Sequence, residues 1–134
     1  MTPTGWVVSG GVVQIPSGSG PWGGLATPSG SYYAGVQGSG AFIQQDVDGL
    51  AAGVAYNLNV WVAERPGYGN SESMRILVDG SPVLDSHHPP EQFTQMTAVF
   101  VASGPSAQIR FENDSPSGDN TFFVRSPLRC VCAP

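Results

Sequence analysis

The sequence contains no lysine, and its five arginines do not form a cluster. Only 11% of the residues are charged, and the formal net charge at pH 7 is -5. Proteins that bind nucleic acid need clustered cations to displace counterions from the phosphate backbone. A basic patch for an anionic membrane surface is missing for the same reason. The composition therefore predicts no nucleic-acid partner. Its neutral polar residues suit a partner recognised through hydroxyl groups.

Long apolar runs are also missing. No run approaches ~18 residues, which excludes a membrane-spanning helix, and no window combines a helical period with capping residues. Residues 1–4 lack the basic start and apolar core of a signal peptide. We expect one domain, residues 1–134, excised from a longer secreted protein and located outside the cell or on its surface.

Cysteine is scarce. Cys130 and Cys132 are the two cysteines of the chain, and a disulfide between residues this close is normally strained. A reduced pair and bridges to parts of a parent protein both remain open. Two thiolates without neighbouring ligands fall short of a structural zinc shell.

Turn formers and alternating apolar residues are abundant. The chain has 18 glycines and 12 prolines, and every second residue from Val54 to Val62 is apolar. This alternation is the period of a half-buried strand, and Asp79-Gly80 is a strong two-residue hairpin signal. We predict strands at residues 6–9, 11–15, 31–37, 41–47, 54–64, 73–79, 81–86, 93–102, 106–112 and 121–127.

Strict up-and-down alternation of these strands predicts an antiparallel β-sandwich with two groups of connections. One end receives Gly38–Gly40, Arg65–Glu72, His87–Gln92 and Asn113–Asn120. The other end receives Pro16–Gly30, Asp48–Gly53, Asp79-Gly80 and Ser103–Pro105. Because three polar loops share the first end, we expect a binding site there.

A series of short segments carries a family resemblance. The segments are Gly5-Trp6, Tyr32–Gly38, Ile43–Val47, Leu50–Tyr56, Ala63–Gly69, Leu77–Gly80 and Gly118–Val124. Their order over nearly the whole chain resembles the galactose-binding-like jelly rolls of carbohydrate-binding modules and secreted surface proteins. The resemblance implies an all-β jelly roll, a glycan partner and a structural Ca²⁺ ion. The Asp-Asn-Val step common in the last strand of such relatives is replaced here by Val124–Pro127, and no Asp-x-Asp-x-Asp-Gly loop is present.

The loop after segment 54–64 offers the first candidate ligand-binding residues. Tyr68 can place its ring against a sugar face, Arg65 presents a planar fork of donors, and Asn70 adds an amide. In the alternative interpretation, Arg65 pairs with Glu64, Glu112 or a carbonyl and fixes the loop, while Tyr68 packs against it.

The neighbouring loops add polar candidates. His87, Asn113 and Asp119 suit hydrogen bonds to sugar hydroxyls, although such residues also stabilise ordinary surface turns. Asn113 begins an Asn-x-Ser sequence, so glycosylation is a further possibility there.

Two tryptophans are candidate stacking platforms. Trp22 lies among glycines in the long loop and either stacks on a ligand or folds back as a lid. Trp61 lies on the outward phase of its strand, where it forms a platform for an extended glycan or contacts a covering loop.

Catalytic signatures are missing. The sequence has no Gly-x-Ser-x-Gly elbow and no His-Glu-x-x-His motif, so we predict that the domain is not an enzyme. The leading hypothesis is a carbohydrate-binding module. The rival is a structural or adhesive surface domain that self-associates, because lysine, a common guard against edge-to-edge strand pairing, is lacking.

Overall fold

The computed structural model describes residues 6–27, 31–66, 72–116, 120–125 and 131–133. Strands dominate this part of the chain, and its one short helix is too short to cross a membrane. The elements are β1 (Val7–Pro16), η1 (Gly20–Trp22), β2 (Tyr32–Asp48), β3 (Ala55–Glu64), β4 (Met74–Val78), β5 (Ser81–His87), β6 (Thr94–Val101), β7 (Ser106–Asn113), β8 (Thr121–Arg125) and β9 (Val131–Ala133).

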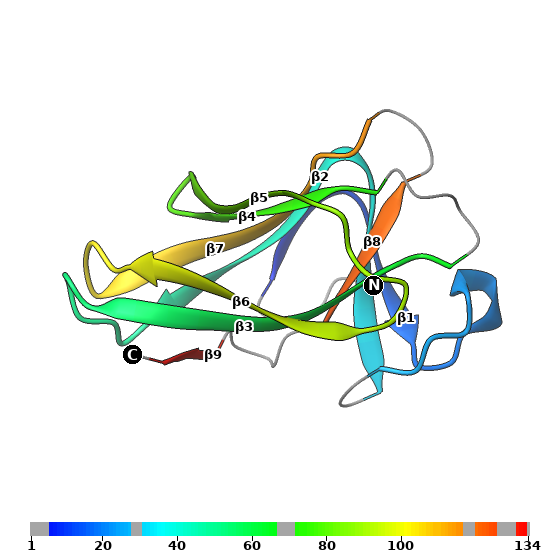
Figure 1. Cartoon of the computed structure of the whole chain (residues 1–134), viewed down its shortest axis with the longest axis horizontal. Coiled ribbons are helices and arrows are strands. Elements are labelled where there is room, and N and C mark those ends of the chain that lie inside the picture. Colours follow the sequence, from blue (N-terminus) through cyan, green and yellow to red (C-terminus); the bar gives the residue numbers. More distant parts are fainter. Residues whose placement is uncertain (1–5, 28–30, 67–71, 117–119, 126–130, 134) are drawn as a thin grey trace.

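The strands pair antiparallel in the order β5-β4-β7-β2-β8-β3-β6, with β1 beside β2 and β9 beside β3. The long strand β2 belongs to both layers of the sandwich. Its second half, residues 42–48, pairs with β7, and residues 34–37 pair with β8. Figure 1 shows β4, β5 and β7 in one layer, β3 and β6 in the other, and β2 passing between them. The predicted antiparallel β-sandwich of jelly-roll type is confirmed.

Two predicted strand breaks are wrong. Segments 6–9 and 11–15 form one strand, β1, with an irregularity at Gly10, whose φ is 79°. Segments 31–37 and 41–47 also form one strand, β2, which bends at Gly38 and Gly40 with φ of 91° and 84°. Positive φ at glycine serves a bulge or a bend as readily as a hairpin turn. Gly38 and Gly40 therefore mark where β2 passes from one layer to the other.

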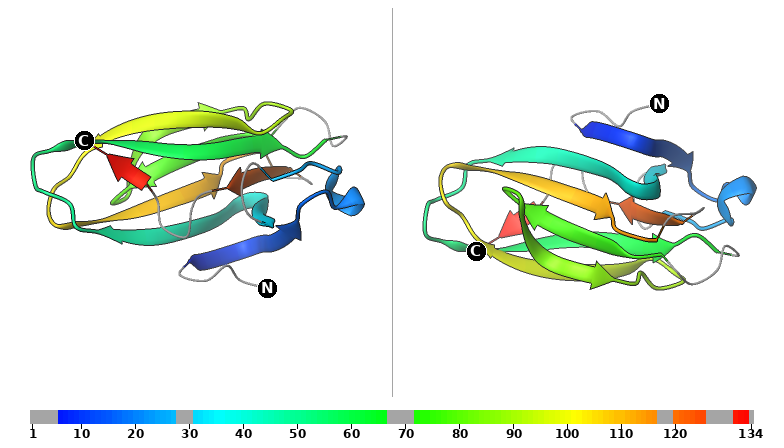
Figure 2. Two further views of the ribbon diagram at one scale, coloured as in Figure 1. Left: turned by 90° about the horizontal axis from the view of Figure 1, so that it is seen from below. Right: turned by 90° about the horizontal axis from the view of Figure 1, so that it is seen from above.

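One loop lies at another end than predicted. The connection 17–31 lies beside the connections after β3, β5 and β7, because the Arg65 side chain that follows β3 donates to Pro21 O. Figure 2 shows the segment that contains η1 at one end of the sandwich, with the connections 49–54 and 102–105 at the other.

The main core lies between the two layers and follows the alternation of the sequence. In β3, Tyr56, Leu58, Val60 and Val62 all point inward and are buried. They meet the inward side chains of the facing layer, of which Ile109 and Phe111 on β7 are fully buried. Burial of these apolar surfaces is the main stabilising contribution to the fold.

A second, smaller core lies on the outer side of the layer that contains β3 and β8. Its buried members are Ile15, Tyr33, Ala63 and Phe123, which stand on the outward phase of their strands. Trp22, Leu25 and Phe93 pack over them. The segment 17–27 therefore covers one end of an outer sheet face that strand alternation alone would leave exposed.

Candidate functional site

Four connections meet at the end of the sandwich that carries η1. We call this end the rim; its connections are residues 17–31, 65–73, 88–93 and 114–120. Backbone hydrogen bonds tie three of them together, because the Glu64 N–H donates to Pro90 O at 2.7 Å and the Asp114 N–H donates to Ser73 O at 3.1 Å. The sequence prediction that the loops after β3, β5 and β7 share one end is therefore confirmed.

Arg65 follows directly after β3 and is buried beneath the rim. Its guanidinium lies 4.3 Å from the centroid of the Trp22 ring, and Nη2 donates to Pro21 O at 3.1 Å. Trp22 also meets Phe123 edge-on, with 6.4 Å between ring centroids. Arg65 thus holds the loop 17–27 against the domain through a carbonyl. In the sequence-based alternative, Arg65 fixes its own loop, of which residues 67–71 lie outside the described ranges.

Trp22 accordingly belongs to the rim and not to the opposite end, where the sequence analysis placed it. It is partly exposed, and Gly23 beside it lies so close to the Pro66 ring that an added Cβ would come within 2.6 Å of it. Only glycine, which also has a φ of 95° here, fits this approach. Trp22 has therefore folded back as a lid over the second core and stays partly exposed.

Asn113, a predicted ligand-binding residue, turns its side chain into the domain. It is fully buried, and its Nδ2 donates to Val36 O at 2.9 Å and to Asn120 O at 3.0 Å. Its Oδ1 accepts from the Ser115 N–H at 3.0 Å. The Asn113 amide therefore holds backbone groups of β2 and of the connection 114–120 in place. The same burial excludes a glycan on Asn113 in the folded domain.

His87 ends β5 opposite Met74 and is partly buried. Burial lowers the pKa of His87, and the neighbouring His88 lowers that pKa further. The neutral ring is therefore favoured more strongly than in an exposed histidine. The proposed hydrogen bond from His87 to a sugar hydroxyl would therefore involve the neutral ring.

Trp61 stands on the outer face of β3, three residues before this strand ends at the rim. Its register partners are Gln95 on β6 and Arg125 on β8, and its ring is partly exposed. Nearby on the same face, the Thr97 hydroxyl donates to Asn59 Oδ1 at 2.7 Å. Tyr68, Asn70 and Asp119 lie outside the described residues.

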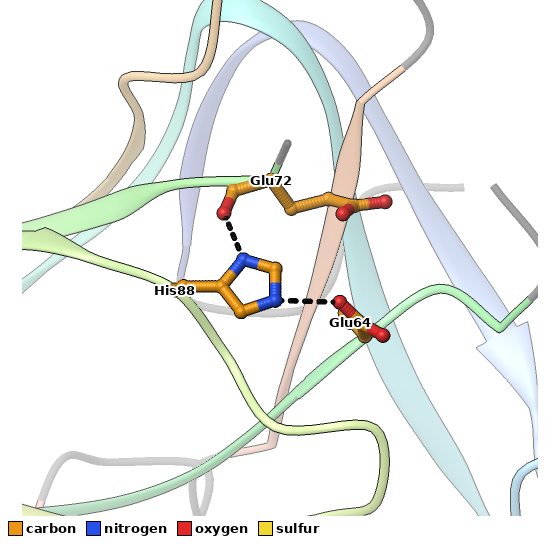
Figure 3. A group of neighbouring side chains, drawn as sticks. All are labelled: Glu64, Glu72 and His88. Atoms are coloured by element: carbon orange, nitrogen blue, oxygen red, sulfur yellow. Dashed lines mark hydrogen bonds and ion pairs between the residues drawn. The ribbon is translucent and has the colours of Figure 1, made fainter. Parts of the chain in front are cut away.

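A cluster of ionisable side chains, which the sequence analysis did not identify, lies within the rim. Glu64, Glu72 and His88 each place one potential ligand atom within 4.8 Å of the other two. His88 Nε2 lies 2.9 Å from Glu64 Oε2, and Nδ1 lies 2.7 Å from the backbone oxygen of Glu72 (Figure 3). Glu64 and Glu72 are 6% and 1% exposed, whereas His88 is exposed.

The predicted calcium ion fits this cluster poorly. Calcium takes six to eight oxygen ligands, while this group offers a ring nitrogen and two carboxylates. No other described group of histidine, cysteine, aspartate and glutamate brings three ligand atoms together. Side chains in the described ranges therefore give no support for the implied Ca²⁺ ion.

Comparison with known proteins supports the fold. No family model matches the chain, and no curated protein matches it. Among solved structures, a family 35 carbohydrate binding module from Clostridium thermocellum is similar with a TM-score of 0.62 and 17% identity, over 89% of this chain and 88% of that one. The CBM22-1 xylan-binding domain from Paenibacillus barcinonensis gives a TM-score of 0.65 and 14% identity, over 92% and 83% of the two chains.

A third similar structure, TmCBM61 in complex with β-1,4-galactotriose, has a TM-score of 0.61 and 14% identity, and the match covers 91% of this chain and 85% of that chain. Each of the three similarities extends over most of both chains. The chain therefore has the galactose-binding-like β-sandwich fold of these carbohydrate-binding modules.

Proposed function

We propose that the domain is a noncatalytic carbohydrate-binding module that holds a glycan at the rim. The observation that carries the proposal is the likeness to carbohydrate-binding modules over about nine-tenths of the chain. The convergence of four connections at one end adds a place for a ligand. Such modules act outside the cell or on its surface, and we extend that location to this domain.

Tyr68 is the central residue of the proposed site. It belongs to the connection 65–73, whose first residue, Arg65, is held by Pro21 and Trp22. An aromatic ring on such an anchored loop can bury the apolar face of a sugar while its hydroxyl stays hydrated. Asn70 and Asp119 are the proposed hydrogen-bonding partners of the sugar, and the exposed part of Trp22 forms a side wall.

Binding is expected to be weak. Polar contacts with sugar hydroxyls replace contacts with water, so each adds little net free energy. A short glycan should therefore bind with a Kd of roughly micromolar to millimolar. Hydrolysis is not expected, because Glu64 and Glu72, the two carboxylates that approach each other in the rim, are buried.

The test compares the rim with the sheet face. Xylan, β-1,4-galactan and an array of short glycans are offered to the wild-type chain, Tyr68→Ala and Trp61→Ala. We expect Tyr68→Ala to weaken binding at least tenfold and Trp61→Ala to leave it within about twofold. Circular dichroism confirms that both variants fold.

If Trp61→Ala weakens binding and Tyr68→Ala does not, the site lies on the outer face of β3. If the wild-type chain binds none of the glycans, the proposal has no support. A parallel series with chelator tests whether a cation takes part. Turnover of a bound glycan into shorter products would contradict the noncatalytic assignment.

One observation favours a second function, self-association through a sheet edge. β6 ends the strand order, and Val99 and Val101 on it are 59% and 63% exposed. An exposed apolar edge strand is a template for pairing with a second copy. Sedimentation velocity at several concentrations, with Val99→Lys as the matched variant, tests this function. A wild-type monomer at high concentration would exclude it.

A further inference from the structure

The cluster of Glu64, Glu72 and His88 follows directly from the strand order. Glu64 is the last residue of β3, Glu72 lies two residues before β4 begins, and His88 follows the last residue of β5. Because these strands alternate in direction, the end of β3, the start of β4 and the end of β5 meet at the rim. Three residues separated by 8 and 16 positions are thereby brought together.

The imidazole of His88 is oriented like that of a metal ligand. A backbone carbonyl can only accept a hydrogen bond, so the contact of 2.7 Å between Nδ1 and Glu72 O places a proton on Nδ1. Nε2 then points at Glu64 Oε2, 2.9 Å away (Figure 3). In most metal sites, a histidine binds the metal through one ring nitrogen and donates the N–H of the other to a carbonyl or carboxylate, which fixes the ring.

Burial of the two carboxylates is the second, independent observation. Glu64 is 6% exposed, and its buried Oε2 makes no hydrogen bond within the described residues, although it approaches His88 Nε2. Taking a carboxylate out of water is costly unless an opposite charge compensates for it. A divalent ion at the three ligand atoms would bring positive charge beside both buried carboxylates.

We propose that Glu64, Glu72 and His88 form a binding site for a divalent transition metal, with Zn²⁺ as the ion that their chemistry suits best. Imidazole nitrogen together with carboxylate oxygen is a common zinc ligand set, whereas calcium prefers oxygen alone. The site lies in the rim but does not depend on glycan binding. It would join the ends of β3 and β5 to the start of β4.

The distances require little rearrangement. Tetrahedral zinc with ligand bonds of about 2.1 Å separates its ligand atoms by about 3.4 Å. The contact of 2.9 Å between Nε2 and Oε2 is already near this value, while the limit of 4.8 Å allows Glu72 to move inward by a side-chain adjustment. His88 is exposed, which leaves a route for the ion to enter.

The test titrates ZnCl₂ into the full, metal-free chain by isothermal titration calorimetry. Because Cys130 and Cys132 are also potential ligands, the Cys130→Ser/Cys132→Ser variant serves as the background. We expect one Zn²⁺ per chain in both proteins and an increase in the melting temperature. In the same background, His88→Gln should weaken binding at least tenfold, and millimolar Ca²⁺ should not compete.

A matched pair of variants separates the site from general surface charge. Glu64→Gln should also weaken Zn²⁺ binding at least tenfold, whereas Glu91→Gln, which alters an exposed carboxylate in the same connection as His88, should not. If Glu64→Gln does not fold, His88→Gln still tests the proposal, because His88 is exposed and its substitution should leave the fold intact.

Three outcomes would overturn the site. They are no binding of Zn²⁺ at 100 µM, loss of binding in the Cys130→Ser/Cys132→Ser variant, and unchanged binding in His88→Gln. Glycan binding measured on the same variants is a separate readout. Either proposal can thus fail while the other stands.

Discussion

The two ends of the sandwich solve the same problem, the reversal of strands, in different ways. At the end opposite the rim, which we call the turn end, short connections are closed by the backbone. The Gly53 N–H donates to Ala102 O at 2.8 Å, and the Leu50 N–H donates to Pro105 O at 3.0 Å. At the rim, side chains do much of this work, as the bonds of Asn113 and Arg65 show.

The contrast extends to burial. Among the buried polar side chains of the described residues, Gln45 lies within β2, and the others belong to the rim or its border. Those others are Glu64, Arg65, Glu72, Asn113, Ser115, Asn120 and Thr121. Buried polar groups contribute less to stability than apolar packing, and departures from apolar burial are expected where a protein has a function. Among the described residues, buried polar side chains therefore gather at the rim, and the turn end reverses the chain with few of them.

The largest expected effect comes from Asn113, which orders the rim. Asn113→Ala removes three hydrogen bonds and leaves the carbonyls of Val36 and Asn120 without this donor. We expect a loss of about 3 kcal/mol in the free energy of unfolding, measured with urea. Asn57→Ala, at an exposed position of β3, should stay within about 0.5 kcal/mol. Equal effects of the two substitutions would contradict the special role of polar groups at the rim.

The next effect concerns the contact between Arg65 and Trp22. A double-mutant cycle with Arg65→Lys and Trp22→Leu should give a coupling free energy of about 1 kcal/mol, since lysine loses the planar stack and its hydrogen bond to Pro21 O. Hydrogen exchange should become faster in residues 17–27 and remain unchanged at the turn end. Strictly additive effects would show that the loop is held by apolar packing alone.

The strands can be predicted well from sequence, because the alternation of apolar and polar residues is visible within a few neighbouring positions. The inward set of β3, from Tyr56 to Val62, could be identified without a structure. The bend at Gly38 and Gly40 could not, because a positive φ gives the same signal in a bend and in a hairpin. One wrong break at each of β1 and β2 left the direction of all later strands unchanged, so the convergence of three loops was still predicted correctly.

The side chains of the rim are harder to predict from sequence. Arg65 meets Pro21 across 44 positions, and no local pattern reports such a contact. Asn113 has the composition of a ligand-binding loop, yet only coordinates reveal that its amide is turned inward. The cluster of Glu64, Glu72 and His88 likewise needs the strand directions before its three members can be seen as neighbours.

A further prediction tests the turn end. Asp79 has a φ of 50°, and its Oδ1 accepts from the Gln108 N–H at 2.9 Å. Asp79→Ala loses this bond and is strained at positive φ, so we expect a loss of about 1.5 kcal/mol. Asp79→Asn keeps an acceptor and tolerates the same backbone, and it should lose about 0.5 kcal/mol or less. Thermal unfolding of the pair measures the difference, and a larger effect for asparagine would contradict this account of the turn.

The smallest expected change in stability concerns the buried hydroxyl of Tyr33. Tyr33 is 3% exposed and packs against Phe93 and Phe123, each with 5.0 Å between ring centroids. Its hydroxyl is buried without a hydrogen-bond partner in the described ranges, so Tyr33→Phe should leave stability unchanged at pH 7 or raise it by up to about 1 kcal/mol.

The same substitution should change the alkaline limb of stability. Burial raises the pKa of Tyr33 above its ordinary value of 10.0, so the folded state holds the phenolic proton more tightly than the unfolded chain. The stability that depends on the neutral phenol is complete below about pH 10 and is lost as the pH rises through the raised pKa. Urea denaturation at pH 9, 10 and 11 should therefore show a shallower decline for Tyr33→Phe than for the wild type. Parallel declines would mean that this hydroxyl titrates alike in the folded and unfolded chains.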